Sequence, residues 1–242
     1  MPKTEVLVLA MTKMLSGICT AGVTREPDPV TGLRWVRPVR EFGSLLPGDM
    51  TYEDGHLVAC CDVVELNLLS PHSDPPHAED WLTDFVHQRP QLLRRLQGKK
   101  RERFFADHLD RAPEDVLVHH RRSLCLVKPE KVCADFALDP YSRKYQARMS
   151  FVLSGQDYAP QATNSRGISV TDLKWRALGR AWLGEASGHL RLEHETLHER
   201  LQAEVIYLSL GLSRSWQGAH WLLVIGVHAI PDCEATIDLH CL

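Results

Sequence analysis

Short apolar runs separated by turn residues dominate the first third of the chain. Four runs rich in Val, Leu and Ile predict strands, at Val6–Ala10, Ile18–Val23, Leu33–Val39 and Leu57–Leu69. The Pro, Gly and Asp residues between these runs are typical of turns. Strands this close together, with no helical pattern between them, favour a small barrel or sandwich over alternating β-α-β units.

The pattern changes between residues 79 and 111. Apolar residues there recur at largely helical spacing amid dense charge, although Pro90 and Gly98 interrupt the run. From residue 89 to residue 105 the sequence has seven basic residues and one acid, Glu102. We expect a charged helical connector, in which the cations form a solvated face or, alternatively, bind phosphate.

Strand-like runs return in the second half of the chain. They are Ser123–Lys128, Gln146–Leu153, Ile168–Thr171, Ala203–Leu212 and His220–Ala229, with short amphipathic helices expected at Leu173–Gly184 and Leu190–Gln202. This order predicts a mainly β (α+β) protein with two β-rich halves on either side of the charged connector.

Composition narrows the class of protein. The chain has 242 residues and a formal net charge of -3, which excludes a wholly basic nucleic-acid coat, so any such contact must be local. The seven cysteines are scattered and contain no C-x-x-C pair, which favours a reducing cytoplasm over a secreted disulfide framework. The apolar run at Val6–Ala10 is too short for a signal peptide or a membrane span, so we expect a cytoplasmic, soluble protein.

Two predicted strands carry basic and aromatic residues that could contact nucleic acid. In the strand around Trp35, side-chain alternation places Trp35 and Arg37 on one face, which suits base stacking and phosphate contact. The simpler alternative is that Trp35 fills the core. In the segment 143–151, Lys144 and Arg148 share a polar face that could meet an acidic ligand or merely confer solubility.

The segment His194-Glu195-Thr196-Leu197-His198 fits the pattern H-E-x-x-H. On a helix, histidines four residues apart share a face and can bind zinc, with the glutamate as general base. The charged residues around this segment are typical of a solvated surface, whereas a zinc-protease helix is buried. We therefore keep His194, Glu195 and His198 as an alternative metal site. The sequence contains no phosphate-binding loop, dinucleotide fingerprint or nucleophile elbow, and we expect no catalytic residue and no cofactor.

Short segments spread over most of the chain resemble the bacterial dual OB-containing domain family. They are Leu9–Ala10, Lys13, Gly17–Gly22, Arg34–Pro38, Asp62–Leu66, Glu79–Leu82, Lys144 with Arg148 and Phe151, Val170–Asp172 and Tyr207–Gly211. The resemblance implies two tandem OB-like barrels and nucleic-acid binding, with a role in prokaryotic defence. We expect the first barrel and the connector at residues 1–115 and the second barrel, with inserted short helices, at residues 116–242.

These inferences predict a protein that binds single-stranded DNA or RNA. The expected contact residues are Lys13, Arg34, Arg37, Arg40, Lys144 and Arg148 for phosphates and Trp35 and Tyr145 for base stacking. Two alternatives stay open: a zinc-dependent hydrolase that uses the H-E-x-x-H segment, and a module that binds a protein partner or a nucleotide signal.

Overall fold

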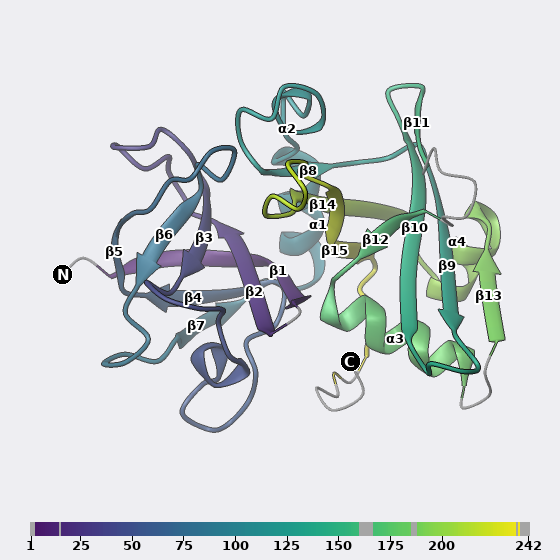
Figure 1. The fold of residues 1–242 in the computed structure, drawn as a ribbon, viewed down its shortest axis with the longest axis horizontal. Coiled ribbons are helices and arrows are strands. Elements are labelled where there is room, and N and C mark those ends of the chain that lie inside the picture. The colour runs from purple at the N-terminus through teal and green to yellow at the C-terminus, as the bar shows by residue number, and fades with distance from the viewer. Residues whose placement is uncertain (1–2, 15, 160–166, 185–187, 236, 238–242) are drawn as a thin grey trace. The chain divides into compact units, whose positions relative to one another are not determined.

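The chain folds into two compact units (Figure 1). A computed structural model describes residues 3–14, 16–159, 167–184, 188–235 and 237. The first unit comprises residues 1–107 and 111–125, and the second comprises residues 108–110 and 126–242. The predicted boundary between residues 115 and 116 falls inside the segment 111–125, which packs with the first unit.

The first unit contains seven strands and three short helices within its described residues. The strands are β1 (Thr4–Met14), β2 (Gly17–Val23), β3 (Trp35–Val39), β4 (Asp62–Leu66), β5 (Leu68–Pro71), β6 (Asp80–Thr83) and β7 (Gln91–Arg95). The helices are the 3-10 turn η1 (Pro47–Met50), α1 (Gly98–Asp107) and α2 (Glu114–Leu117).

One bent run of chain closes the first sheet into a barrel. β4 pairs with β1 and β5 pairs with β6, yet only Asn67 separates β4 from β5. Because β1, β2 and β3 are neighbours and β3 runs parallel to β6, the run 62–71 completes a five-stranded ring of OB type. β7 adds to the outside of this ring by pairing with β4.

Asp62 fixes the long connection between β3 and β4 onto the barrel. Its buried carboxylate accepts hydrogen bonds from the Tyr52 hydroxyl at 2.8 Å and from the Ala59 amide at 3.0 Å, and Arg95 Nε lies 2.5 Å from the same group. The hydrogen bond to Asp62 raises the pKa of Arg95, and burial raises the pKa of Tyr52. A fully buried carboxylate needs such donors, so this cluster orders the connection.

The second unit is built from a second set of strands and two helices. The strands are β8 (Leu124–Val127), β9 (Lys131–Leu138), β10 (Tyr145–Leu153), β11 (Gln156–Tyr158), β12 (Ile168–Val170), β13 (Gly188–Leu192), β14 (Val205–Leu212) and β15 (Leu222–Ile230). The helices are α3 (Leu173–Leu183) and α4 (His194–Leu201).

The second barrel also closes through an interrupted strand whose two parts pair with different neighbours, but this strand has a different place in the barrel. β8 pairs with β14 and β9 pairs with β10, while only residues 128–130 separate β8 from β9. The ring continues through β12, which runs parallel to β15, and β15 pairs with β14. The interrupted strand is therefore the fourth in the first barrel and the first in the second. β13 is added to the free side of β9, and α4 packs on β9.

Helix α3 is anchored by its N-cap and by a close contact with the sheet. Buried Asp172 accepts a hydrogen bond from the Trp175 amide at 3.0 Å and another from the Val227 amide at 2.8 Å. Burial raises the pKa of Asp172 to about 6 even though both amides favour the ionised form. About two turns along the helix from Asp172, Gly179 lies against the Phe136 ring so closely that a Cβ would overlap it.

Glu79 fixes the segment that begins β8. Its buried carboxylate accepts hydrogen bonds from the Ser123 amide at 2.8 Å, the Ser123 hydroxyl at 2.9 Å and the Leu124 amide at 2.9 Å. Three donors satisfy a charge that would otherwise be costly to bury. Leu124 and Cys125 belong to the first unit, whereas the remainder of β8 belongs to the second.

The mainly β fold with two OB-like barrels is confirmed, but the predicted helical connector is wrong over much of its length. Residues 80–83 and 91–95 form β6 and β7, and only α1 is helical between residues 79 and 107. Adjacent apolar pairs such as Leu92-Leu93 fit a helix face and a strand equally well. These segments form strands because β6 pairs with β3 and β5, and β7 pairs with β4. The predicted helix at 190–202 likewise begins as β13, and β9 was not predicted.

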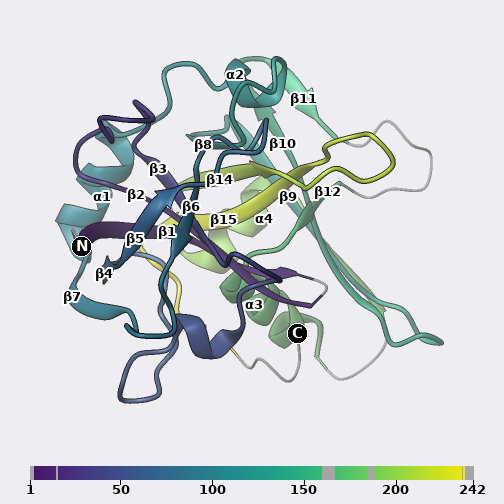
Figure 2. The same ribbon diagram turned by 60° about the vertical axis from the view of Figure 1, so that its left-hand side comes forward.

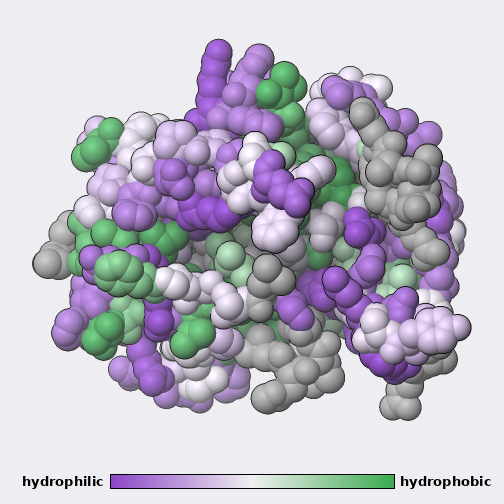
Figure 3. Space-filling model, in the orientation of Figure 1, coloured by the Kyte–Doolittle hydropathy of each residue, from purple (hydrophilic) through white to green (hydrophobic). Residues whose placement is uncertain are grey.

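The surface mixes polar and apolar residues. Figure 3 shows that hydrophilic residues cover most of the face in view, with hydrophobic residues between them in separate patches. Each helix that the structure describes is too short or too polar to cross a membrane.

Candidate nucleic-acid interface

Exposed aromatic side chains gather on two hairpin ends of the second unit. Among the described residues, the exposed Phe, Tyr and Trp side chains are Phe42, Tyr141, Trp216 and Trp221. Tyr141 is 94% exposed, Trp216 65% and Trp221 60%. Tyr141 lies between β9 and β10, and both tryptophans lie between β14 and β15. Three of these four aromatics therefore belong to only two connections.

A tight turn holds Trp216 at the end of the β14–β15 hairpin. The Trp216 amide donates to the Ala219 carbonyl at 2.9 Å, and the Ala219 amide donates back at 3.1 Å. The two residues between them, Gln217 and Gly218, have φ angles of 52° and 79°. Positive φ at both central positions is the geometry of a two-residue hairpin turn that matches strand twist. The turn therefore fixes the backbone that carries Trp216.

Hydrogen bonds across the same hairpin hold Trp221. The Ser213 amide donates to the Trp221 carbonyl at 2.8 Å, and the Trp221 amide donates to Ser213 Oγ at 2.9 Å. His220 Nδ1 lies 2.8 Å from the Ser213 carbonyl. The backbone of this hairpin end is thus bonded on both sides while both indole rings face solvent.

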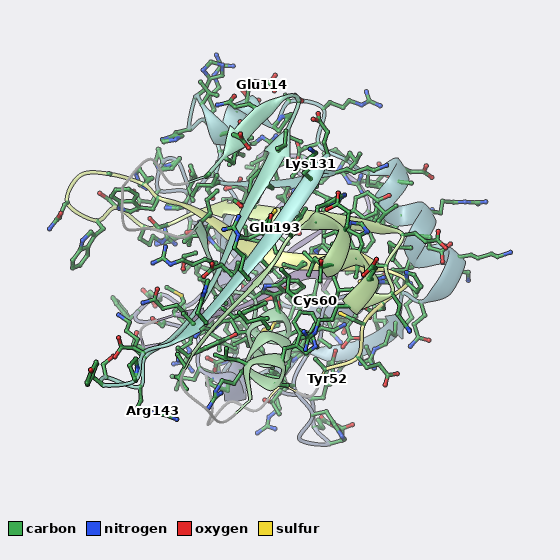
Figure 4. The ribbon with its side chains drawn as sticks, turned by 90° about the vertical axis from the view of Figure 1, so that its right-hand side faces the viewer. Tyr52, Cys60, Glu114, Lys131, Arg143 and Glu193 are labelled. Atoms are coloured by element: carbon green, nitrogen blue, oxygen red, sulfur yellow. The ribbon has the colours of Figure 1, made fainter. Side chains whose placement is uncertain are left out.

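Asp139 orders the hairpin end that carries Tyr141. Its Oδ1 accepts hydrogen bonds from the amides of Tyr141 and Ser142 at 3.0 and 2.7 Å, and from the Ser142 hydroxyl at 3.0 Å. The Ser142 amide is the main cause of a lowered pKa at Asp139. Arg143 and Lys144 follow and are exposed. Figure 4 places Arg143 at the far end of the β9–β10 hairpin, away from Glu193.

Between these hairpin ends, β10 has one buried and one polar face. Ala147, Met149 and Phe151 are buried, as the predicted alternation requires. Arg148 lies on the other face, where Nη1 donates to the Gly167 carbonyl at 3.0 Å, at the start of β12. OB folds bind oligonucleotides on their second and third strands and on the connections 1–2 and 4–5. Here these are β10, β12 and the two hairpin ends, which extend to the same side of the unit (Figures 2 and 4).

Comparison with known families agrees with this topology. The family described as the dual OB-containing domain matches residues 4–227, which include both barrels. The chain belongs to the dual OB-containing domain family. Searches of curated proteins and of solved structures each returned no match. Family membership supports a binding role of the kind common to OB folds, and the residues of this chain must indicate where binding takes place.

In this dual OB-containing domain, Tyr145 is packed rather than presented for stacking. Its hydroxyl donates to the Arg176 carbonyl of α3 at 2.9 Å, and the Arg176 guanidinium lies 5.0 Å from the centre of its ring. Burial raises the pKa of Tyr145. Tyr145, which we predicted as a stacking residue, therefore lies on the packed side of the β9–β10 hairpin, while Tyr141 of the same hairpin is exposed.

Trp35 and Arg37 of the first barrel are also packed. Trp35 is 7% exposed and Arg37 is 6% exposed. The Arg37 guanidinium lies 2.6 Å from Asp80 Oδ1, across the parallel pair β3 and β6. The prediction that Trp35 and Arg37 form a stacking and phosphate surface does not fit this placement, because the first four residues of β3 are buried on both faces of the strand.

The other predicted cations of the first barrel have contacts within it. Arg34 Nε donates to the Thr24 carbonyl at 3.1 Å, which joins the chain after β2 to the chain before β3. Arg40 Nη2 lies 2.6 Å from Asp49 Oδ1 next to η1. Lys13 is half-buried on β1. Arg34 and Arg40 are thus each bonded to a neighbouring segment of the first barrel.

The H-E-x-x-H histidines lie on α4 as the motif requires, but both have structural contacts. His194 Nδ1 accepts a hydrogen bond from the Val132 amide at 3.2 Å, and His198 Nδ1 donates to the Ala203 carbonyl at 2.8 Å. The first contact assigns the proton of neutral His194 to Nε2, which removes the lone pair that a metal would need there. Glu195 is exposed. Within the described part of the chain, no group of three or more His, Cys, Asp or Glu residues could hold a metal ion.

Tyr141, Trp216 and Trp221 are not among the contact residues predicted from the sequence. A usable signal exists in two turn-forming pairs: Gln217-Gly218 lies between two predicted strands, and Asp139-Pro140 precedes the extended segment 143–151. An aromatic residue beside such a pair has little chance of burial, since the ends of hairpins lie at the surface.

Proposed function

We propose that the second barrel binds single-stranded nucleic acid, DNA or RNA, by stacking bases on Tyr141, Trp216 and Trp221. The observation that carries this proposal is the exposure of these three rings on the two hairpin ends that flank β10 and β12. Stacking of a base on an aromatic ring contributes about 1–3 kcal/mol and tolerates any base. Rings on hydrogen-bonded hairpins lose little conformational freedom on binding, which favours affinity.

Cations beside these rings would contact the phosphates. Arg143 and Lys144 follow Tyr141 on the same hairpin, and Arg148 extends the set along the polar face of β10. We retain Lys144 and Arg148 from the predicted set and add Arg143. The protein has a net charge of -3, so attraction of the ligand depends on this local group.

The first barrel would contribute little to base stacking. Trp35 is buried there, and its corresponding first connection is short, since β1 ends at Met14 and β2 begins at Gly17. Phe42 is the only exposed Phe, Tyr or Trp side chain among the described residues of the first unit, and it lies on the connection between β3 and β4.

We also propose that the protein acts in a reducing cytoplasm. The six cysteines among the described residues are free thiols, which agrees with that setting. A role in prokaryotic defence is part of the same proposal and rests on the family resemblance alone.

Alanine substitution of each hairpin aromatic tests the proposal. Binding of labelled 15-nucleotide single-stranded DNA and RNA would be measured by fluorescence anisotropy at low and moderate salt. Each of Tyr141→Ala, Trp216→Ala and Trp221→Ala is expected to weaken binding by about 5- to 150-fold. Phe42→Ala is the matched control, because it removes an equally exposed ring outside the site.

The outcomes separate the proposal from its rivals. Loss of binding in the three hairpin variants but not in Phe42→Ala supports stacking on the second barrel. Equal affinity in all four variants, or no binding by folded wild type, would contradict it and favour a module that binds a protein partner or a nucleotide signal.

A further inference from the structure

The basic residues between 89 and 103, before and within α1, fall into two groups: those with a partner and those without an acidic partner. Arg94 lies 3.0 Å from Glu5, and Arg95 lies 2.5 Å from Asp62. Arg101 is buried and donates to Cys61 Sγ at 3.3 Å. The remaining cations of the run are exposed and have no acidic partner among the described residues; they are Arg89, Lys99, Lys100 and Arg103.

Strand β7 and helix α1 meet at one anchored corner. Beyond the ion pair of β7 with Asp62, the Leu96 amide donates to the Cys61 carbonyl at 2.8 Å, and Arg101 of α1 reaches the sulfur of the same cysteine. Two adjacent residues, Cys61 and Asp62, therefore bind both the end of β7 and the first turn of α1. The cations on both elements belong to one fixed surface, which we call the β7–α1 surface.

Helical spacing directs the unpaired cations of α1 outward. Arg101 and Phe105 are four residues apart, both are buried, and the guanidinium lies 5.2 Å from the ring centre. Lys99 and Arg103 are also four residues apart, about 200° around the helix from the buried pair, and Lys100 lies beside them. Because Arg101 is buried, α1 is fixed in orientation, and the neighbouring cations Lys99, Lys100 and Arg103 remain exposed.

The strand contributes backbone donors to the same surface. β7 lies at the end of the strand order and pairs only with β4 among the described strands, so its outer edge has no strand partner. All five of its residues are exposed, including Leu92 at 46% and Leu93 at 42%. Edge amides are hydrogen-bond donors for phosphate oxygens, and a surface of cations and amides matches an anionic chain.

We propose that the β7–α1 surface binds the phosphodiester backbone of nucleic acid, including that of a duplex. The aromatic residues of α1, Phe104 and Phe105, are half-buried and buried, so the surface offers no ring for base stacking. Contact through phosphates alone does not require unpaired bases and does not depend on sequence. This surface belongs to the first unit and does not rest on the proposed stacking site of the second barrel.

Binding of a blunt 20-base-pair DNA duplex to the full-length protein tests this proposal. Affinity would be measured by anisotropy between 50 and 200 mM salt for wild type and for the triple variant Lys99→Gln, Lys100→Gln and Arg103→Gln. Each lost phosphate contact lowers the slope of log K against log salt by about 0.9, so the triple variant should lose about 2 to 3 units of slope. A charge-matched control replaces three exposed cations elsewhere with Gln: Arg25, Lys128 and Lys131.

Three results would support the proposal together: duplex binding by wild type, the loss of slope in the α1 variant, and an unchanged slope in the control. The double variant Trp216→Ala and Trp221→Ala should keep full duplex affinity, which separates this surface from the stacking site. No duplex binding by folded wild type at 50 mM salt, or equal losses in both triple variants, would overturn the proposal. Binding of poly-L-glutamate as tight as that of the duplex would also overturn it and identify a surface for acidic proteins.

Discussion

Arg37 and Asp80 form a buried ion pair across the parallel strands that close the first barrel. Both Nε and Nη2 of the arginine lie 2.6 Å from Oδ1 of the aspartate, and the two residues are direct partners in the β3–β6 register. Arg37 therefore has a structural contact at the seam of the barrel.

Replacing Arg37 should destabilise the first barrel. Arg37→Met leaves the Asp80 carboxylate buried without its cation, a change that costs about 3–5 kcal/mol in comparable buried pairs. Urea unfolding followed by circular dichroism measures the loss. Arg25→Met removes an exposed arginine and should change stability by less than about 0.5 kcal/mol. Equal stabilities for the two variants would show that the pair contributes little.

Two tyrosines four residues apart should respond in opposite ways. Tyr145→Phe removes the hydroxyl that donates to the Arg176 carbonyl and should lower stability by about 1 kcal/mol without changing affinity for single strands. Tyr141→Ala should weaken single-strand binding at unchanged stability, because its ring is 94% exposed. Thermal unfolding and anisotropy on the same samples provide both readouts. Weaker binding by Tyr145→Phe alone would reverse the assignment.

Asp172 should make the stability of the second barrel fall with rising pH. Burial raises its pKa from 3.8 to about 6, so the folded state binds the proton more tightly than the unfolded state. Its contribution is therefore retained below about pH 4 and lost as the pH rises through about 6, a loss of about 3 kcal/mol. Asp172→Asn does not titrate, although its amide would face the Val227 amide and lower overall stability.

The measurement for Asp172 is the free energy of unfolding at pH values from 4 to 7. The difference between wild type and Asp172→Asn should shrink as the pH rises through 6, because only the wild type loses stability by ionisation at this site. Asp157→Asn changes an exposed carboxyl and should follow the wild-type pH profile. A constant difference between wild type and Asp172→Asn would refute the shifted pKa.

Gly179 should tolerate no side chain. Its Cα approaches the Phe136 ring so closely that the added methyl of Gly179→Ala must displace the ring or the helix, at a cost of about 1–3 kcal/mol. Phe136→Leu in the same chain should restore part of the lost stability by making room. Ala181→Ser, on the exposed side of α3, is the control. If Gly179→Ala were as stable as wild type, α3 would not be packed this closely.

Local sequence patterns predicted the individual strands of both barrels better than they predicted which strands pair with one another. The alternation in β10 placed Met149 and Phe151 inside and Arg148 outside, because side-chain direction in a strand follows from sequence spacing alone. The ion pair of Arg37 depends on β6, which pairs with β3 from more than forty residues away. β6 itself looks helical in isolation, so neither its pairing nor the acid it brings to Arg37 could be read from the pattern.

For the candidate site, the sequence predicted side-chain direction only within single short segments. Lys144 is exposed and Arg148 is half-buried on the polar face of β10, which is the face that the alternation predicts. The contact of Tyr145 with α3 could not be predicted from the sequence, because it depends on how the helix packs on the barrel. Phe136 and Gly179 illustrate the same limit, since the contact between strand and helix is set by the folded chain.

The hydrogen bonds of Glu79 limit the positions at which this chain could be cut into two separate barrels. A first barrel cut before Ser123 would keep a buried carboxylate but lose its three donors, and a second barrel cut after Cys125 would lack half of its opening strand. A division at either point would therefore leave one barrel incomplete, so gene fusion or recombination at these points should be disfavoured.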